Sequence, residues 1–166
     1  MTLLNFARSA QVQITINKDI ELGGDSLNVP ETVWRGALKN VQLDTIAGIR
    51  HAELYGQPSW RLHVAEITGK VNCHFHKCGA EIYEVVEGAG TLYYGRVIGS
   101  GDLQNKLAIT WEEARPVSTG DHFTIPEGFA HQLVRHGDAP LTIIFACPDT
   151  HLGTDRFPLP DAPSLP

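Results

Sequence analysis

The amino-acid sequence predicts an all-β protein, either a small barrel or a sandwich of two sheets. Glycine and proline interrupt the middle of the chain at short intervals, and the pieces between them are strand-like. No long stretch repeats apolar residues at helical spacing. A chain of 166 residues is long enough for one packed core and short for two domains. We therefore expect many short strands around a single core.

The elements can be followed from the N-terminus. Val12, Ile14 and Ile16 alternate with polar residues, which predicts a half-buried strand. Pro30 can open a short helix over residues 31–38. The apolar residues that share one face of this helix are Val33, Trp34, Ala37 and Leu38. Further strands are predicted over residues 41–49, 60–67, 81–86, 91–98, 106–110, 121–125, 130–135 and 141–147.

Two further segments complete the predicted organisation. Residues 87–90 carry two glycines between two predicted strands, which indicates a hairpin. The last nineteen residues hold five of the ten prolines, so we expect no strand there. The chain then divides into an N-terminal strand and helix extension (1–43), a barrel (44–150) and a proline-rich tail (151–166).

Charge and hydropathy exclude several classes of partner. The net charge of -6, without any basic run, argues against a nucleic-acid partner. The longest apolar stretch, about residues 141–147, is far shorter than the ~20 residues of a membrane helix. The N-terminus lacks the apolar segment of a signal peptide, so we expect a cytoplasmic protein with no membrane partner. Cys73, Cys78 and Cys147 are an odd number, which is typical of reduced thiols.

One constellation of residues has the composition of a metal site. His74 and His76 are two residues apart, so on a strand their imidazoles share a face about 6–7 Å apart. A turn at Gly79 would return the chain so that Glu81 lies beside them, and His131 follows a second turn, at residues 126–128. Three imidazoles and one carboxylate suit one divalent ion of Fe, Mn, Ni, Zn or Cu. A zinc–thiolate site at Cys73 and Cys78 is the alternative, but no second cysteine pair accompanies them.

These residues and their flanking glycines resemble the two motifs of the cupin superfamily. The similarity covers residues 60–147, with Gly69 one residue nearer to the first histidine than the motif asks. Arg135 stands where the family prefers asparagine. The resemblance implies a double-stranded β-helix (jelly-roll) barrel with the metal inside, plus a hairpin extension around residues 99–106. The positions that match the motifs are His74, His76, Glu81, Gly88, Gly120, Pro126, Gly128 and His131.

Alternation along the strands selects candidate ligand-binding residues on the metal-facing side: Arg135, Tyr83 and Lys70. A guanidinium at Arg135 can bind a carboxylate or phosphate through two parallel hydrogen bonds. Its alternative role is a rim arginine paired with a surface acid. Tyr83 can bond to a substrate or only fill the barrel. We therefore expect a small, anionic ligand.

Several functions are compatible with this site, because cupins host many. The first hypothesis is a metal-dependent enzyme acting on a small anionic molecule. It divides into a sugar-phosphate isomerase or epimerase, since residues 74–76 and 147–149 resemble archaeal-type phosphoglucose isomerases, and an Fe-type dioxygenase. The alternative is a non-catalytic module that binds a small molecule. We also predict a homodimer, formed when the strand at residues 11–16 joins a neighbour's sheet edge.

Overall fold

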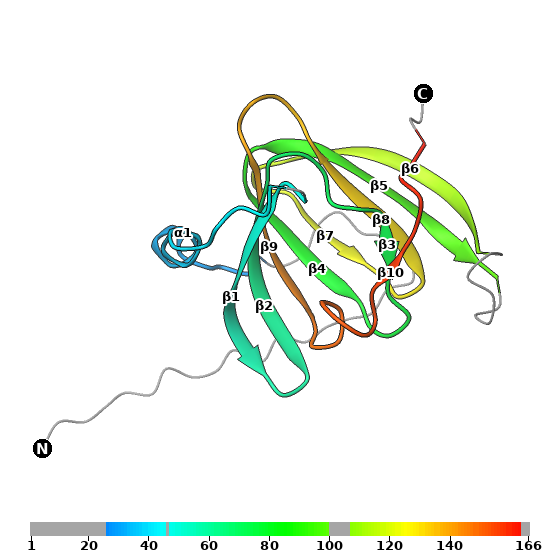
Figure 1. Cartoon of the computed structure of the whole chain (residues 1–166), viewed down its shortest axis with the longest axis horizontal. Coiled ribbons are helices and arrows are strands. Elements are labelled where there is room, and N and C mark those ends of the chain that lie inside the picture. Colours follow the sequence, from blue (N-terminus) through cyan, green and yellow to red (C-terminus); the bar gives the residue numbers. More distant parts are fainter. Residues whose placement is uncertain (1–25, 46, 100–106, 164–166) are drawn as a thin grey trace, which may run out of the picture.

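The computed structural model describes residues 26–45, 47–99 and 107–163 (Figure 1). Two five-stranded sheets, in which all neighbouring strands pair antiparallel, enclose one core. The predicted all-β fold class is confirmed. The strand predicted at residues 11–16 lies outside the described residues, so the homodimer that rests on it remains a prediction.

The first sheet has the strand order β1-β2-β9-β4-β7 and the second has the order β10-β3-β8-β5-β6. The first sheet consists of β1 (Ile49–Gln57), β2 (Trp60–Ile67), β9 (Leu141–Pro148), β4 (Glu81–Glu87) and β7 (His122–Ile125). The second consists of β10 (Phe157–Pro158), β3 (His74–Phe75), β8 (Phe129–Arg135), β5 (Ala89–Ile98) and β6 (Ala108–Ser118). Sequential strands therefore often lie in opposite sheets.

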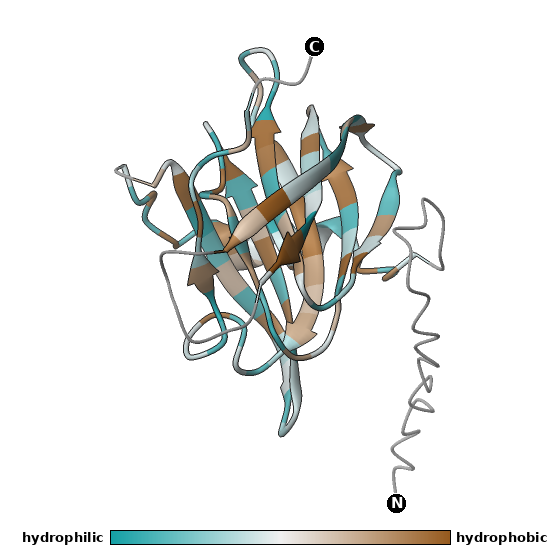
Figure 2. Cartoon of the chain, turned by 90° about the vertical axis from the view of Figure 1, so that its right-hand side faces the viewer, coloured by the Kyte–Doolittle hydropathy of each residue, from teal (hydrophilic) through white to brown (hydrophobic). Residues whose placement is uncertain are grey.

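The core lies between the two sheets and follows the alternation of the strands. In β4, the side chains of Glu81, Tyr83 and Val85 are buried, and the intervening residues are only half-buried. Tyr83 and Val85 join a continuous apolar cluster with residues of both sheets. Figure 2 shows this alternation as brown and teal bands along the strands. Because Glu81 precedes two inward-facing residues at a spacing of two, the strand carries its carboxylate into the barrel.

The predicted helix is confirmed as α1 (Glu31–Leu38), which packs on the outer face of the first sheet. Trp34 and Leu38 contact Val64 and Ile144 in a second, smaller cluster. Val33 was expected on the same face, but it is 48% exposed. It precedes Trp34 by one residue, which is a rotation of about 100° around the helix axis. In the described part of the chain, no helix combines the length and apolarity needed to cross a membrane.

The structure corrects the prediction of a hairpin at residues 87–90. The strands β4 and β5 lie in different sheets, so the chain crosses between sheets here. Gly88 makes this crossing possible because its φ of 83° belongs to the left-handed region. A side chain would also collide with the neighbouring loop, since a Cβ atom would lie 2.2 Å from the carbonyl oxygen of Pro140.

Two predicted strand ranges were also wrong. The described residues 41–45 and 47–48 contain only turns and an isolated bridge between Asp44 and Ile49, and the strand runs instead over Ile49–Gln57. Gly48 has a φ of 66°. The chain therefore turns at this residue, and pairing with the neighbouring strand begins only at Ile49. The strand β6 extends to Ser118, well beyond the predicted 106–110, because β5 pairs with it from Ala89 to Ile98. The tip of the predicted hairpin extension, residues 100–106, lies outside the described residues.

The proline-rich tail does contain a strand, contrary to prediction. Phe157 pairs with Phe75, and Pro158 pairs with His74. A proline is tolerated because β10 is an edge strand, where one missing N–H leaves no neighbour unpaired. The rings of Phe157 and Phe75 lie 5.2 Å apart. The tail therefore pairs with the edge of β3 that β8 leaves free, and β3 is the strand that begins with His74.

Exchange of Gly88 for alanine should destabilise the fold by about 3 kcal/mol, because it adds a steric clash to a left-handed backbone. Gly137 is a matched control, with a φ of 65° and nothing within 4 Å of its added Cβ atom. Gly137→Ala should cost only about 1 kcal/mol, the cost of the backbone conformation alone. Chemical denaturation measures both. Equal losses would show that the approach of Pro140 contributes nothing.

Candidate metal centre

The four predicted ligands meet inside the barrel. His74 lies on β3, His76 directly follows it, Glu81 begins β4, and His131 lies on β8. His74 and His131 face each other across paired strands, with ring centroids 4.3 Å apart. All four side chains are at most 5% exposed. Their potential ligand atoms lie within 4.8 Å of one another, a separation that one ion can bridge.

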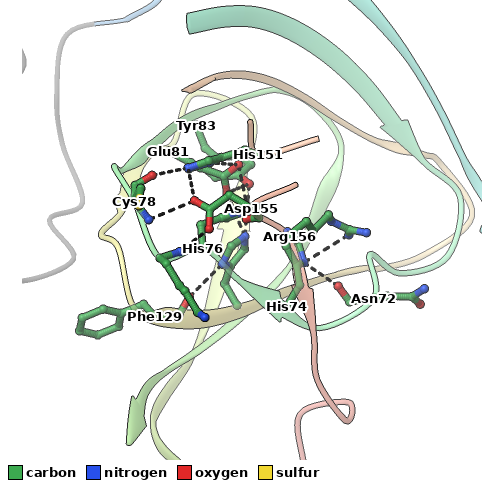
Figure 3. Close-up of polar contacts among 12 residues, drawn as sticks. Asn72, His74, His76, Cys78, Glu81, Tyr83, Phe129, His151, Asp155 and Arg156 are labelled. Carbon is green, nitrogen blue, oxygen red and sulfur yellow. Dashed lines mark hydrogen bonds and ion pairs between the residues drawn. The ribbon is translucent and has the colours of Figure 1, made fainter. Parts of the chain in front are cut away.

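The Glu81 carboxylate lies beside Tyr83 and His151 in this part of the barrel (Figure 3). Its Oε2 atom is 3.0 Å from His131 Nε2 and accepts a hydrogen bond of 2.7 Å from the Tyr83 hydroxyl. Its Oε1 atom is 3.4 Å from His76 Nε2. The carboxylate therefore contacts the Nε2 atoms of both His131 and His76.

Backbone carbonyls orient all three imidazoles. The Nδ1 atom of His74 lies 2.8 Å from the Asn72 carbonyl oxygen, and that of His131 lies 3.3 Å from the Phe129 oxygen. His76 Nδ1 bonds to the Asp155 carbonyl. When Nδ1–H donates to a carbonyl, the lone pair remains on Nε2, which is the usual arrangement behind a metal-ligating histidine.

A divalent ion fits these residues. The Nε2 atom of His76 is buried and makes no hydrogen bond within the described residues. A buried nitrogen that makes no hydrogen bond is costly, and a metal ion would satisfy it. Three imidazoles and one carboxylate are the donor types that first-row transition metals prefer. The donor set and the unsatisfied nitrogen agree with a single divalent ion.

The protonation states also suit metal binding. Burial lowers the pKa of His74 to about 2, helped by His131 and Arg156, and lowers that of His76 to about 4. Both imidazoles are therefore neutral near pH 7 and can donate a lone pair. Burial alone would raise the pKa of Glu81, but hydrogen bonding with His131 and His151 holds it well below its usual value. Burial raises the pKa of Tyr83, so its phenol stays protonated and donates to Glu81.

Sequence analysis missed a fourth histidine in the site. His151 is fully buried, and its ring stacks on His76 with centroids 3.8 Å apart. Its Nδ1 atom lies 3.2 Å from Glu81 Oε1, and its Nε2 atom lies 2.7 Å from the Cys78 carbonyl oxygen. This residue follows β9 in the proline-rich tail, outside both motifs. No spacing in the sequence could have indicated it.

Asp155 and Arg156 were missed for the same reason. The Asp155 carboxylate accepts hydrogen bonds of 3.0 Å from the backbone N–H groups of Lys77 and Cys78. It therefore fixes the turn that follows His76. The Arg156 guanidinium lies 3.3 Å from His74 Nδ1 and lines the cavity above the cluster. The tail thus supplies side chains to the centre as well as a strand to the sheet.

Of the three predicted ligand-binding residues, only Tyr83 lines the cavity. Arg135 donates a hydrogen bond to the Gly137 carbonyl, and Lys70 pairs with Asp161. Arg135 pairs with Gly90 near the far end of β8, where the strand leaves the ligand cluster behind. The structure therefore does not bring Arg135 and Lys70 to the candidate ligand residues, and Arg156 lies beside His74 instead.

The cysteines do not form the alternative zinc–thiolate site. Among the described residues, no group able to hold an ion contains two cysteines. Cys78 is exposed, and Cys73 is buried with a pKa raised to about 11, chiefly by burial. Cys147 lies near Glu81 and His151, but burial and the Glu81 charge raise its pKa to about 12. The side chains of Cys73 and Cys147 are therefore thiols at neutral pH.

The ligands lie in a cavity of about 500 Å³ that opens from the barrel. Its walls come from the strands and from residues outside them, chiefly in the segments 41–45 and 151–156. A volume of this size accommodates a small molecule. The centre is therefore accessible to a ligand, although its side chains are shielded from bulk solvent.

No protein-family model and no curated protein matches this sequence. Solved structures do match its fold. RemF, a polyketide cyclase from Streptomyces resistomycificus, has a TM-score of 0.53 and 17% identity, covering 75% of this chain and 84% of that chain. KdgF from Halomonas sp. has a TM-score of 0.50 and 22% identity, covering 66% and 86%. The cupin domain of Schizosaccharomyces pombe Cnp3 has a TM-score of 0.50 and 15% identity, covering 67% and 69%.

The two sheets enclose a histidine–glutamate cluster that could hold a metal ion. The chain has the fold of the cupin superfamily. The predicted jelly-roll barrel is thereby confirmed. Identities of 15–22% show the fold alone, so the activity has to be argued from the residues of this chain.

Proposed function

We propose that the protein holds one divalent metal ion through His74, His76, Glu81 and His131 and uses it to bind and transform a small anionic molecule. The observation that carries this proposal is the orientation of three buried imidazoles. Each has one ring nitrogen against a backbone carbonyl, and two of them turn Nε2 toward a carboxylate at the floor of an open cavity. A structural site would have no reason to face such a cavity.

Charge favours an anionic ligand. A divalent ion together with the Glu81 carboxylate leaves a single positive charge, because the imidazoles are neutral. Arg156 adds a second positive charge beside His74. When bound, the ion would act as a Lewis acid toward a carbonyl or carboxylate oxygen. Arg156 would orient the anionic end of the ligand, and the Tyr83 hydroxyl would orient the Glu81 carboxylate through its hydrogen bond to Oε2.

Proton-holding groups near the ligands favour an enzyme over a binding module. Tyr83 and His151 both lie within hydrogen-bonding distance of Glu81, and His51 lines the same cavity. General acid–base chemistry requires such groups close to the reacting atoms, whereas simple capture does not. A sugar-phosphate isomerase or epimerase and an Fe-type dioxygenase remain the two reaction classes.

Titration of the metal-free protein tests the proposal. Calorimetry with Mn(II), Fe(II), Ni(II), Cu(II) and Zn(II) should give one ion per chain for at least one metal. Oxygen uptake by the Fe(II)-loaded protein with small carboxylates then separates the dioxygenase from the isomerase. A chain that takes up none of these ions would contradict the proposed function.

A further inference from the structure

The cavity contains one guanidinium that is available to a ligand. Arg156 forms no ion pair with any residue that the structure describes. Arg50, the other arginine of the cavity, is paired with Glu66 at 2.7 Å. Arg156 therefore marks the place for an anionic group, directly beside the His74 ring.

The remaining inner wall is apolar. The side chains that line the cavity around the ligand cluster come from both sheets and from the segment before β3: Ile49, Ala65, Val71, Leu133, Ile143 and Phe145. They belong to the main core or pack against it, so they form a fixed surface. Apart from the ligand cluster, its neighbours and the two arginines, the polar lining consists of Gln42, Asp44 and His51.

This wall discriminates between the ligands that an anion site can accept. A sugar phosphate would bury several hydroxyl groups against alkyl and aromatic side chains that cannot bond to them. Each hydroxyl group that loses its hydrogen-bond partner weakens binding. An alkyl or aromatic body needs no such partner, and each methylene buried there strengthens binding.

We infer that the ligand is an amphiphilic carboxylate, in which one carboxylate is joined to an apolar body. Its carboxylate lies between Arg156 and the metal, and its body lies on the wall formed by Ile143, Phe145 and their neighbours. This inference rests on the proposed function, because it assigns the metal-bound end of the ligand. It favours a carboxylate as the substrate over a sugar phosphate.

Calorimetry on the full-length, zinc-loaded protein provides the test. The probes are propanoate, pentanoate, heptanoate and 4-phenylbutanoate, with heptanamide and glucose 6-phosphate for comparison. Affinity should rise about threefold to fourfold per added methylene, as expected for burial of apolar area. Heptanoate should bind at least tenfold more tightly than heptanamide or the sugar phosphate. A flat series, or tighter binding of glucose 6-phosphate, would overturn the inference.

Two arginine variants locate the carboxylate. Arg156→Gln should weaken heptanoate binding about tenfold, the loss of one hydrogen bond to a charged group, and should leave zinc stoichiometry unchanged. Arg135→Gln is the matched control, because Arg135 lies outside the cavity lining, and it should bind heptanoate as the wild type does. Equal effects of the two variants would refute the assignment of Arg156. Loss of zinc binding by the wild type would instead refute the proposed metal site, which keeps the two failures distinguishable.

Discussion

His76→Ala is expected to lower metal affinity by at least about a hundredfold while the barrel stays folded. His76 provides the unsatisfied, buried Nε2 atom, so its removal deletes one of four ligands. Removing a residue that hydrogen-bonds to a metal ligand already lowers metal affinity about tenfold to a hundredfold. Removing the ligand itself should therefore lower the affinity further. Elemental analysis after dialysis and a calorimetric titration measure the effect.

His63→Ala is the matched control for this variant. His63 is also a buried histidine, 4% exposed, and it stacks on Phe145 without belonging to any group able to hold an ion. This variant should lose stability and keep its metal. The double variant Cys73→Ser and Cys78→Ser should also keep its metal. Unchanged metal content in His76→Ala would disprove the ligand assignment.

Asp155→Ala should weaken metal binding about tenfold to a hundredfold, although Asp155 belongs to the tail. Its carboxylate accepts hydrogen bonds from the Lys77 and Cys78 backbone N–H groups, and its carbonyl contacts His76 Nδ1. Without the carboxylate, the turn after His76 loses its anchor and the imidazole loses its fixed orientation. The free energy of unfolding should fall by about 1.5–3 kcal/mol, as for a lost hydrogen bond to a charged group.

Asp161→Ala provides the comparison, because it removes a carboxylate from the same tail. Asp161 accepts hydrogen bonds from Gln132 and Lys70, neither of which is a ligand. Its loss should leave metal affinity unchanged. If both variants bind metal equally well, the Asp155 carboxylate does not contribute to metal affinity. Calorimetry on the two proteins decides between these outcomes.

The convergence of the four candidate ligand residues and the positions of most strands were predictable because both depend on local spacing. His74 and His76 share a face on any strand, and glycine and proline mark the turns that return Glu81 and His131 to them. The crossing at Gly88 could not be distinguished from a hairpin. Both need a left-handed glycine, and only the sheet to which the next strand pairs separates them.

The tail residues were unpredictable for a different reason. His151, Asp155 and Arg156 act through contacts with positions more than seventy residues earlier, such as Cys78 and His74. Proline content argued against a strand there, and the argument fails at an edge, where a missing N–H group is harmless. Alternation along β8 predicts which face of the sheet Arg135 lies on, but it does not predict how far the residue is from the ligand cluster. Arg135 is the last residue of β8 and does not line the cavity.

The contacts of the tail also impose an order on the assembly of the centre during synthesis. A ribosome delivers His74, His76, Glu81 and His131 before His151, Asp155 and the β10 strand emerge. The barrel can therefore close around its four ligands while the turn after His76 still lacks its anchor. If the centre holds the proposed metal ion, a nascent chain would exchange that ion freely until residues 151–158 have emerged and the turn after His76 is anchored.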